Sequence, residues 1–151
     1  MSDQIKIKIN GNEIEATKGQ MIIEVTDNNQ VHVPRFCYHP KLSIAANCRM
    51  CMVEVKNVGK PLPACATPIS DGMEIFTKTP LALTAQKGTM EFLLLNHPLD
   101  CPICDQGGEC DLQDQAMAFG HDGSRYDEHK RAVGDQYMGP LINTIMTRCI
   151  H

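Results

Sequence analysis

The chain has 151 residues, of which 42% are hydrophobic, so it can form one ordinary domain or two small ones with a packed core. Its 18 acidic residues outnumber 14 basic ones and give a formal net charge of -4. A weakly acidic chain without basic runs is a poor candidate for binding nucleic acid, whose phosphates attract clustered Lys and Arg. No apolar run is long enough to cross a bilayer, and the first residues lack the features of a signal peptide.

The N-terminal third predicts a β-hairpin, a short helix and a loop. Apolar and charged residues alternate over residues 5–9, as in a strand with one buried face. Asn10–Gly11 is a preferred pair for a tight hairpin turn, and residues 13–17 supply the returning strand. The apolar residues 21–25 predict a short helix, whereas residues 36–51 lack apolar periodicity and are expected to form a loop.

Further strands are expected beyond this loop. Residues 52–56 and 73–76 have strand patterns, and the two prolines within residues 60–63 predict an interruption of regular structure between them. A hairpin, a helix and further strands together predict a small α+β domain over residues 1–78.

The clearest helix follows that domain. Thr79 can cap the free amide groups of a helix whose first residue is Pro80, and the helix is expected to run to about Leu95. Pro98 prevents its continuation. A second irregular loop follows, and residues 111–118 predict one short helix.

Eight cysteines are the most informative feature of the composition. A chain that stays in the reducing cytosol uses such thiols as metal ligands more often than as disulfides. The first set has a Cys-x10-Cys-x2-Cys-x13-Cys spacing and consists of Cys37, Cys48, Cys51 and Cys65. A loop that carries three thiols, with a fourth from a later segment, can surround a two-iron cluster. A four-cysteine zinc site is the alternative, although zinc ligands more often come as two close pairs.

The second set adds a histidine. Its His-x3-Cys-x2-Cys-x5-Cys spacing comprises His97, Cys101, Cys104 and Cys110. This compact loop is broken by prolines and glycines and can wrap a cluster of four irons. A lone His97 could simply cap the preceding helix, and zinc held by one histidine and three cysteines is the competing metal site. No glycine-rich phosphate-binding pattern is present, so hydride chemistry is expected on a partner.

These motifs resemble a known family. The resemblance rests on residues 36–40 (FCYHP), 48–51 (CRMC), 63–68 (PACATP) and 96–114. They are similar to the iron–sulfur segments of the large iron–sulfur subunit of respiratory complex I (NADH–quinone oxidoreductase), which is also called the 75-kilodalton subunit. The resemblance covers nearly the whole chain.

The resemblance implies a β-grasp, ferredoxin-like [2Fe–2S] domain followed by a helical [4Fe–4S] segment. It makes the first set the ligands of the [2Fe–2S] cluster, and the second set the ligands of the [4Fe–4S] cluster. The implied divisions are residues 1–78, residues 79–119, and residues 120–151 as the start of a further [4Fe–4S] domain that lacks its continuation. Cys149 resembles the first cysteine of that further motif, and this sequence ends before the motif's next cysteine, so the resemblance implies an N-terminal fragment.

The implied function is electron transfer from NADH and flavin mononucleotide (FMN) toward quinone in a respiratory translocase. The expected partners are other subunits of the complex I peripheral arm, including the one that binds NADH and FMN, with no nucleic acid and no membrane span. The expected location is the cytoplasmic face of the bacterial inner membrane, or the matrix side in mitochondria. No complete active site is expected on this chain.

Two alternatives stay open from the sequence. The first is a diaphorase iron–sulfur subunit of an NAD-linked hydrogenase or formate dehydrogenase, which resembles complex I over the same module. The second, from another class, is a zinc-stabilised interaction module without a redox role.

Overall fold

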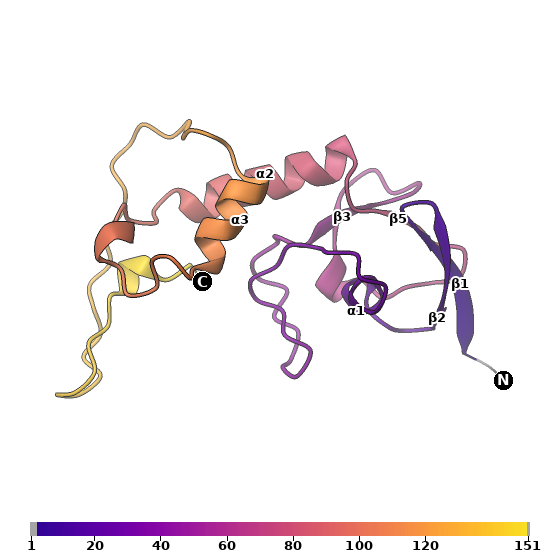
Figure 1. Cartoon of the computed structure of the whole chain (residues 1–151), viewed down its shortest axis with the longest axis horizontal. Helices are drawn as coiled ribbons and strands as arrows, with labels where there is room; N and C mark the ends of the chain where they lie inside the picture. Colours follow the sequence, from indigo (N-terminus) through magenta and orange to yellow (C-terminus); the bar gives the residue numbers. More distant parts are fainter. Residues whose placement is uncertain (1–2, 151) are drawn as a thin grey trace. The chain divides into compact units, whose positions relative to one another are not determined.

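The structure is a computed structural model that describes residues 3–150, traced in Figure 1. The described residues divide into two compact units, one ending at Thr89 and the other beginning at Met90. The strands are β1 Gln4–Ile9, β2 Asn12–Thr17, β3 Met52–Val55, β4 Leu62–Pro63 and β5 Glu74–Phe76. The α-helices are α1 Ile22–Asn28, α2 Pro80–Leu94 and α3 Asp111–Phe119, and the short 3-10 helices are η1 Ala64–Ala66, η2 Cys101–Ile103 and η3 Met146–Arg148.

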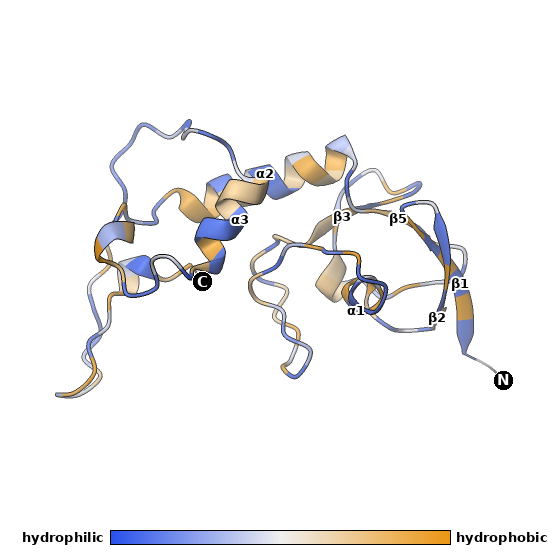
Figure 2. Ribbon diagram, viewed as in Figure 1, coloured by the Kyte–Doolittle hydropathy of each residue, from blue (hydrophilic) through white to orange (hydrophobic). Residues whose placement is uncertain are grey.

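Strands β1 and β2 form the antiparallel hairpin that the alternation predicts. Ile7 and Ile9 are buried while the lysines of β1 are exposed, and Figure 2 shows this alternation of hydropathy along the strand. Asn10 and Gly11 occupy the turn with φ values of 51° and 90°. Positive φ at both central positions matches the twist of the strands, which is why this pair permits such a short connection.

The hairpin belongs to a five-stranded mixed sheet with the order β2-β1-β5-β3-β4. β1 and β5 are parallel and pair through Ile9 and Ile75, whereas β3 is antiparallel to both of its neighbours. Helix α1 contributes Ile22, Ile23 and Val25 to the same hydrophobic core as the strands. One helix held against a mixed sheet is the β-grasp arrangement, so the predicted α+β class is confirmed.

The short strand β4 corrects one prediction. The prolines of residues 60–63 predict an interruption of regular structure, and this is wrong for Leu62 and Pro63, which pair with Val53 and Met52 respectively. Proline lacks a backbone N–H, which excludes it from a central strand but not from an edge strand, whose outer side has no ladder partner. Because β4 is the edge strand of the sheet, Pro63 is tolerated there.

Helix α2 starts and ends close to the predicted residues. The Thr79 Oγ1 atom accepts a hydrogen bond from the Ala82 N–H at 3.3 Å, and Pro80 is the first helical residue. The helix ends at Leu94, next to the predicted end at Leu95. The cap and the proline therefore define this N-terminus as the sequence predicts.

The first turns of α2 pack on the sheet of the first unit. Ala82 is buried, and the Gln86 Nε2 atom donates a hydrogen bond to the Met52 carbonyl of β3 at 2.9 Å. The Thr89 hydroxyl donates to the Arg49 carbonyl at 3.3 Å. These contacts explain why the compact unit extends beyond residue 78.

The second unit contains α3 and long irregular segments. Residues 120–145 form neither helix nor strand. Two threonine hydroxyls link residues 133–136 to residues 144–147. Thr144 Oγ1 accepts a hydrogen bond from the Gln136 N–H and donates one to the Gln136 carbonyl. Thr147 Oγ1 forms the same two bonds with the N–H and the carbonyl of Val133. These side chains replace the backbone pairing that a sheet would provide.

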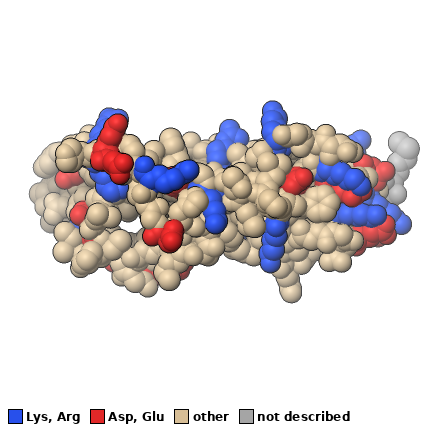
Figure 3. Space-filling model, turned by 90° about the horizontal axis from the view of Figure 1, so that it is seen from above, with Lys and Arg blue, Asp and Glu red and all other residues tan. Residues whose placement is uncertain are grey.

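Surface cations lie next to carboxylates within each unit, and Figure 3 shows both signs interspersed on one face. Lys56 Nζ lies 2.8 Å from Glu74 Oε1, and Arg125 Nε donates to Glu91 Oε1 at 2.8 Å. Each hydrogen bond lowers the pKa of its glutamate. Exposed pairs of this kind contribute little to stability.

Within residues 3–150, no helix is both long and apolar enough to cross a membrane.

Replacing Ile75 by Ala is expected to destabilise the first unit by about 3 kcal/mol, because a buried isoleucine leaves a cavity when it is truncated. Ile75 is 0% exposed on the middle strand β5. The matched control is Ile44→Ala in the loop, where the side chain is 41% exposed and the expected change is below about 0.5 kcal/mol. Urea denaturation followed by circular dichroism measures both, and equal effects would contradict the position of the core.

Candidate functional site

The first predicted ligand set comes from two segments of the first unit. Cys37, Cys48 and Cys51 lie in the loop between α1 and β3, and Cys65 lies in η1, directly after β4. Cys51 and Cys65 are each 1% exposed and belong to the hydrophobic core. Cys48 is also buried, and Cys37 is partly exposed. Protein therefore covers this site on the side of Cys51 and Cys65.

The loop directs backbone N–H groups at the sulfurs. The Cys48 N–H donates a hydrogen bond to Cys37 Sγ at 3.4 Å, and the Met50 N–H donates to Cys48 Sγ at 3.5 Å. Ala46 and Arg49 have φ values of 49° and 58°, a left-handed conformation that redirects successive peptide groups. Such N–H···S bonds stabilise negative charge on sulfur and tune the potential of a bound cluster.

The charges of Cys37, Cys48 and Cys51 act on the ionisation of Cys65. Burial, followed by the negative charges of the other three cysteines, raises the pKa of Cys65 to about 12. Burial also raises the pKa of Cys48. Burial acts in the same direction at Cys37, but hydrogen bonds from the Cys48 and Asn47 backbones lower its pKa overall. Buried sulfur anions that repel each other fit a compact cationic group, such as an iron–sulfide core, placed among them.

Arg35 holds the start of this loop. Its guanidinium forms a two-pronged ion pair with Asp27 of α1, and its Nε atom donates a hydrogen bond to the Val33 carbonyl at 3.1 Å. The hydrogen bond to Asp27 raises the pKa of Arg35 above its ordinary value. The guanidinium also lies over the Tyr38 ring, 5.7 Å from its centroid, and Tyr38 packs against the core. This ion pair connects the loop at Cys37 to helix α1.

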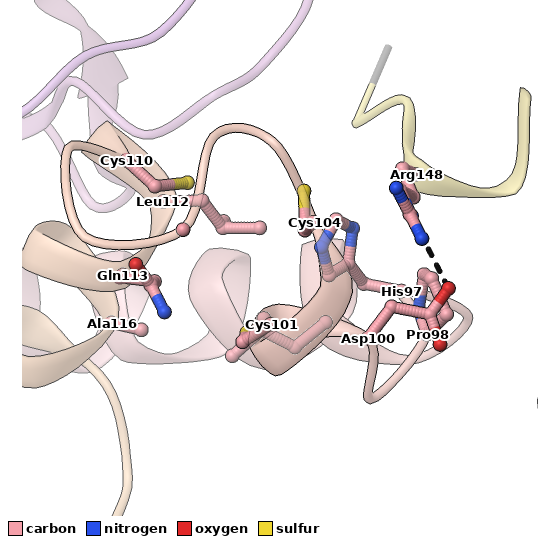
Figure 4. A pocket seen from close by; sticks show the side chains of 12 residues that line it. His97, Pro98, Asp100, Cys101, Cys104, Cys110, Leu112, Gln113, Ala116 and Arg148 are labelled. Carbon is pink, nitrogen blue, oxygen red and sulfur yellow. Dashed lines mark hydrogen bonds and ion pairs between the residues drawn. The ribbon is translucent and has the colours of Figure 1, made fainter. Parts of the chain in front are cut away.

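The second predicted ligand set lines one cavity in the second unit (Figure 4). The cavity has a volume of about 160 Å³, and its lining includes all four predicted ligands, His97, Cys101, Cys104 and Cys110. The two ends of the set are His97, after α2, and Cys110, before α3. The 3-10 helix η2 carries Cys101 between them. The compact spacing in the sequence therefore corresponds to one site in space.

Gly107 allows the loop around this cavity to close on itself. Its N–H donates a hydrogen bond to the Cys104 carbonyl at 2.9 Å. A Cβ atom at this position would lie 2.6 Å from the Cys101 carbonyl oxygen, which is closer than real contacts allow. Gly108 has a φ of +93°, and the Gln113 Oε1 atom accepts a hydrogen bond from its N–H at 3.0 Å. The Gly107–Gly108 pair thus brings the three cysteines around one space.

His97 is half-buried and has an unsatisfied ring atom. Its Nδ1 atom is buried and has no hydrogen-bond partner among the described residues. Burial and the positive charges of Lys130 and Arg148 lower the pKa of His97, while Asp100 acts in the opposite direction. Because a metal binds the neutral imidazole, these surroundings favour the form that can act as a ligand. A buried ring nitrogen without a partner fits a site for a metal cluster.

Two charged residues at this site, Asp100 and Arg148, are absent from the sequence-based prediction. Both line the cavity, and the Arg148 Nε atom donates a hydrogen bond to Asp100 Oδ2 at 3.2 Å. Asp100 directly precedes the predicted ligand Cys101 in the sequence, but the spacing of cysteine and histidine ligands gives no weight to a neighbouring carboxylate. Arg148 is remote in the chain, and nothing in the sequence brings it to this cavity.

Within residues 3–150, no three His, Cys, Asp or Glu side chains converge tightly enough to hold a single metal ion.

Two protein families match this chain. The family described as "2Fe-2S iron-sulfur cluster binding domain" matches residues 2–80. The family described as "NADH-ubiquinone oxidoreductase-G iron-sulfur binding region" matches residues 86–125. These matches confirm the two predicted cofactors, a [2Fe–2S] cluster and a [4Fe–4S] cluster.

Similar curated proteins are complex I subunits. The chain is 54% identical to the NADH-ubiquinone oxidoreductase 75 kDa subunit of Reclinomonas americana, over 97% of this chain and 21% of that protein. It is 56% identical to the corresponding NADH-quinone oxidoreductase subunit of Rickettsia felis, over 97% of this chain and 22% of that protein. The chain therefore spans about a fifth of the length of these relatives, and its predicted resemblance to them is confirmed.

A solved structure shares the fold. A chain in the crystal structure of an NAD+-reducing [NiFe]-hydrogenase in its H2-reduced state aligns with a TM-score of 0.73 and 24% sequence identity. The alignment covers 97% of this chain and 62% of the hydrogenase chain. At this identity the likeness concerns the fold alone.

Gly107→Ala is expected to lower the iron and sulfide bound at the second site, because the added Cβ would force the Cys101 and Cys104 carbonyls apart. The matched control is Gly123→Ala in the same unit, where the added Cβ would meet open space. Iron and acid-labile sulfide analysis, together with electron paramagnetic resonance (EPR) of each cluster, measures the outcome. Full retention of both clusters by the Gly107 variant would contradict the described role of this glycine.

Proposed function

Because the chain belongs to the family of 2Fe-2S iron–sulfur cluster binding domains, we propose that its first ligand set holds a [2Fe–2S] cluster. The ligands in this proposal are Cys37, Cys48, Cys51 and Cys65. Support comes from the N–H groups aimed at Cys37 and Cys48 and from the effect of the other three cysteines on the pKa of Cys65. The family match encloses all four residues.

The second ligand set is proposed to hold a [4Fe–4S] cluster. The ligands are His97, Cys101, Cys104 and Cys110. The observation that carries this assignment is that all four line one cavity, in which His97 keeps a buried ring nitrogen without a partner among the described residues. The functional division proposed is residues 1–78 for the first cluster and residues 79–119 for the second. Residues 120–151 then form a third part that resembles the start of a further [4Fe–4S] domain.

Electron transfer in NADH–quinone oxidoreductase is the function that these sites support best. The supporting relatives are subunits of that oxidoreductase at 54–56% identity over nearly the whole chain. In this role the chain accepts electrons that originate from NADH and FMN on a neighbouring subunit and passes them toward quinone. The proposed location is peripheral, on the cytoplasmic face of a bacterial inner membrane or on the matrix side in mitochondria. The diaphorase alternative has only the likeness of fold to a hydrogenase chain in its support.

The chain's own residues position and tune the redox groups. The clusters supply the one-electron chemistry when bound. Backbone N–H groups around Cys37 and Cys48 stabilise sulfur charge, and the core around Cys51 and Cys65 excludes water. At the second site the neutral imidazole of His97 replaces one thiolate, which makes the site less negative and favours a higher potential. In this proposal the chain itself supplies no general acid, base or nucleophile.

Cys104→Ser is expected to remove the EPR signal of the [4Fe–4S] cluster and to leave the [2Fe–2S] signal, because the two ligand sets are separate. Cys51→Ser should produce the reverse pattern. The matched control is Cys149→Ser, which lies outside both proposed ligand sets and should keep both signals. Retention of the [4Fe–4S] signal in the Cys104 variant would remove this residue from the site.

Metal analysis distinguishes the electron-transfer proposal from the zinc alternative. Anaerobically purified protein is expected to contain iron and acid-labile sulfide, with a visible absorption band that bleaches on reduction. Elemental analysis and absorption spectroscopy measure both properties. A colourless protein with stoichiometric zinc would refute the electron-transfer proposal.

A further inference from the structure

Arg148 brings a fixed positive charge to the cavity of the second site. The 3-10 helix η3 carries this residue, and Figure 4 shows its side chain reaching from the C-terminal segment toward Asp100 beside His97. The Arg148 side chain is 16% exposed, so it is mostly withdrawn from solvent. Among the described residues, Asp100 is its hydrogen-bond partner, through Nε alone. The Nη groups of Arg148 therefore form no hydrogen bond with the described residues.

Asp100 is the opposing charge at the same cavity wall. It directly precedes Cys101, and its carbonyl accepts the hydrogen bond from the Ile103 N–H that starts η2. Its carboxylate accepts the hydrogen bond from Arg148 at 3.2 Å, with 37% of the side chain exposed. The cation and the anion thus reach the second ligand set from two segments that are far apart in the sequence.

Other charges near this site are differently engaged. The Lys130 Nζ atom donates hydrogen bonds to the carbonyls of Leu94 and Leu95 at 2.8 and 3.1 Å, so it caps the end of α2. Lys130 is exposed, whereas Arg148 is mostly withdrawn from solvent. Water screens an exposed charge more strongly than a half-buried one. Among the described residues, Arg148 and Asp100 are the basic and acidic side chains that line the cavity.

We propose that Arg148 and Asp100 are positioning residues that set the reduction potential of the cluster at the second site in opposite directions. This inference rests on the proposed [4Fe–4S] ligand set. Reduction adds negative charge to a cluster, so a nearby guanidinium stabilises the reduced form and a nearby carboxylate destabilises it. The ion pair also attaches the segment at Arg148 to the loop at Cys101, and in this way couples the charge to the site.

The test is the midpoint potential of the [4Fe–4S] cluster, measured by EPR-monitored redox titration of the full chain and three variants. Arg148→Gln removes the cation and should lower the potential. Asp100→Asn removes the anion but keeps an oxygen that can accept the hydrogen bond, and should raise the potential. Arg148→Lys keeps the charge and should restore most of the unmodified value. The matched control is Arg125→Gln, whose arginine pairs with Glu91 and does not line the cavity.

Shifts of opposite sign support the proposal, because an ion pair with a purely structural role would respond in the same direction to the loss of either partner. Shifts of equal sign, or no shift, would overturn it. If Arg148→Gln loses the cluster, Asp100→Asn decides the question: a raised potential supports the proposal, and an unchanged or lowered potential overturns it. A missing [4Fe–4S] signal in the unmodified chain counts instead against the proposed ligand set, so the two failures are distinguishable.

Discussion

Sulfur anions repel one another, and in the proposed ligand assignment each unit of this chain holds several of them in a small space. In the first unit burial, followed by this repulsion, raises the pKa of Cys65 to about 12. The protein offsets part of the cost with N–H groups directed at Cys37 and Cys48. A cationic group among the thiols would offset the remaining cost of ionising them, and an iron–sulfide core has the chemistry to do so.

The two sites meet the same constraint in different ways. The first gathers its cysteines from a loop and from η1 at the edge of a β-grasp sheet, and it buries two of them in the core. The second is local in sequence and, in the proposed assignment, replaces one anion by neutral His97, whose pKa is lowered by burial and neighbouring cations. In these proposals the first site relies on backbone N–H groups, and the second relies on ligand type together with the charged pair of Arg148 and Asp100.

The sequence predicts the features that depend on local physics. The alternation in β1, the positive φ at Asn10 and Gly11, and the cap at Thr79 follow from neighbouring residues alone. The ligand spacings are equally readable, because each set is dominated by a short motif. Strand β4 is not, since proline at an edge can be recognised only once the strand order is known. The approach of Arg148 to Asp100 depends on how an irregular segment returns to the loop, and no periodicity encodes such a path.

The distribution of buried side chains indicates how strongly each unit depends on its cofactor. The first unit has a continuous core of strand and helix residues, to which Cys51 and Cys65 also belong. In the described part of the second unit, Met90 and Leu112 are the only buried hydrophobic residues. A loop held by so little apolar burial gains most from a cross-link that joins four of its side chains. In the proposed assignment, cluster binding would cross-link residues 97–110 where hydrophobic packing is sparse, whereas the first unit is stabilised mainly by its core.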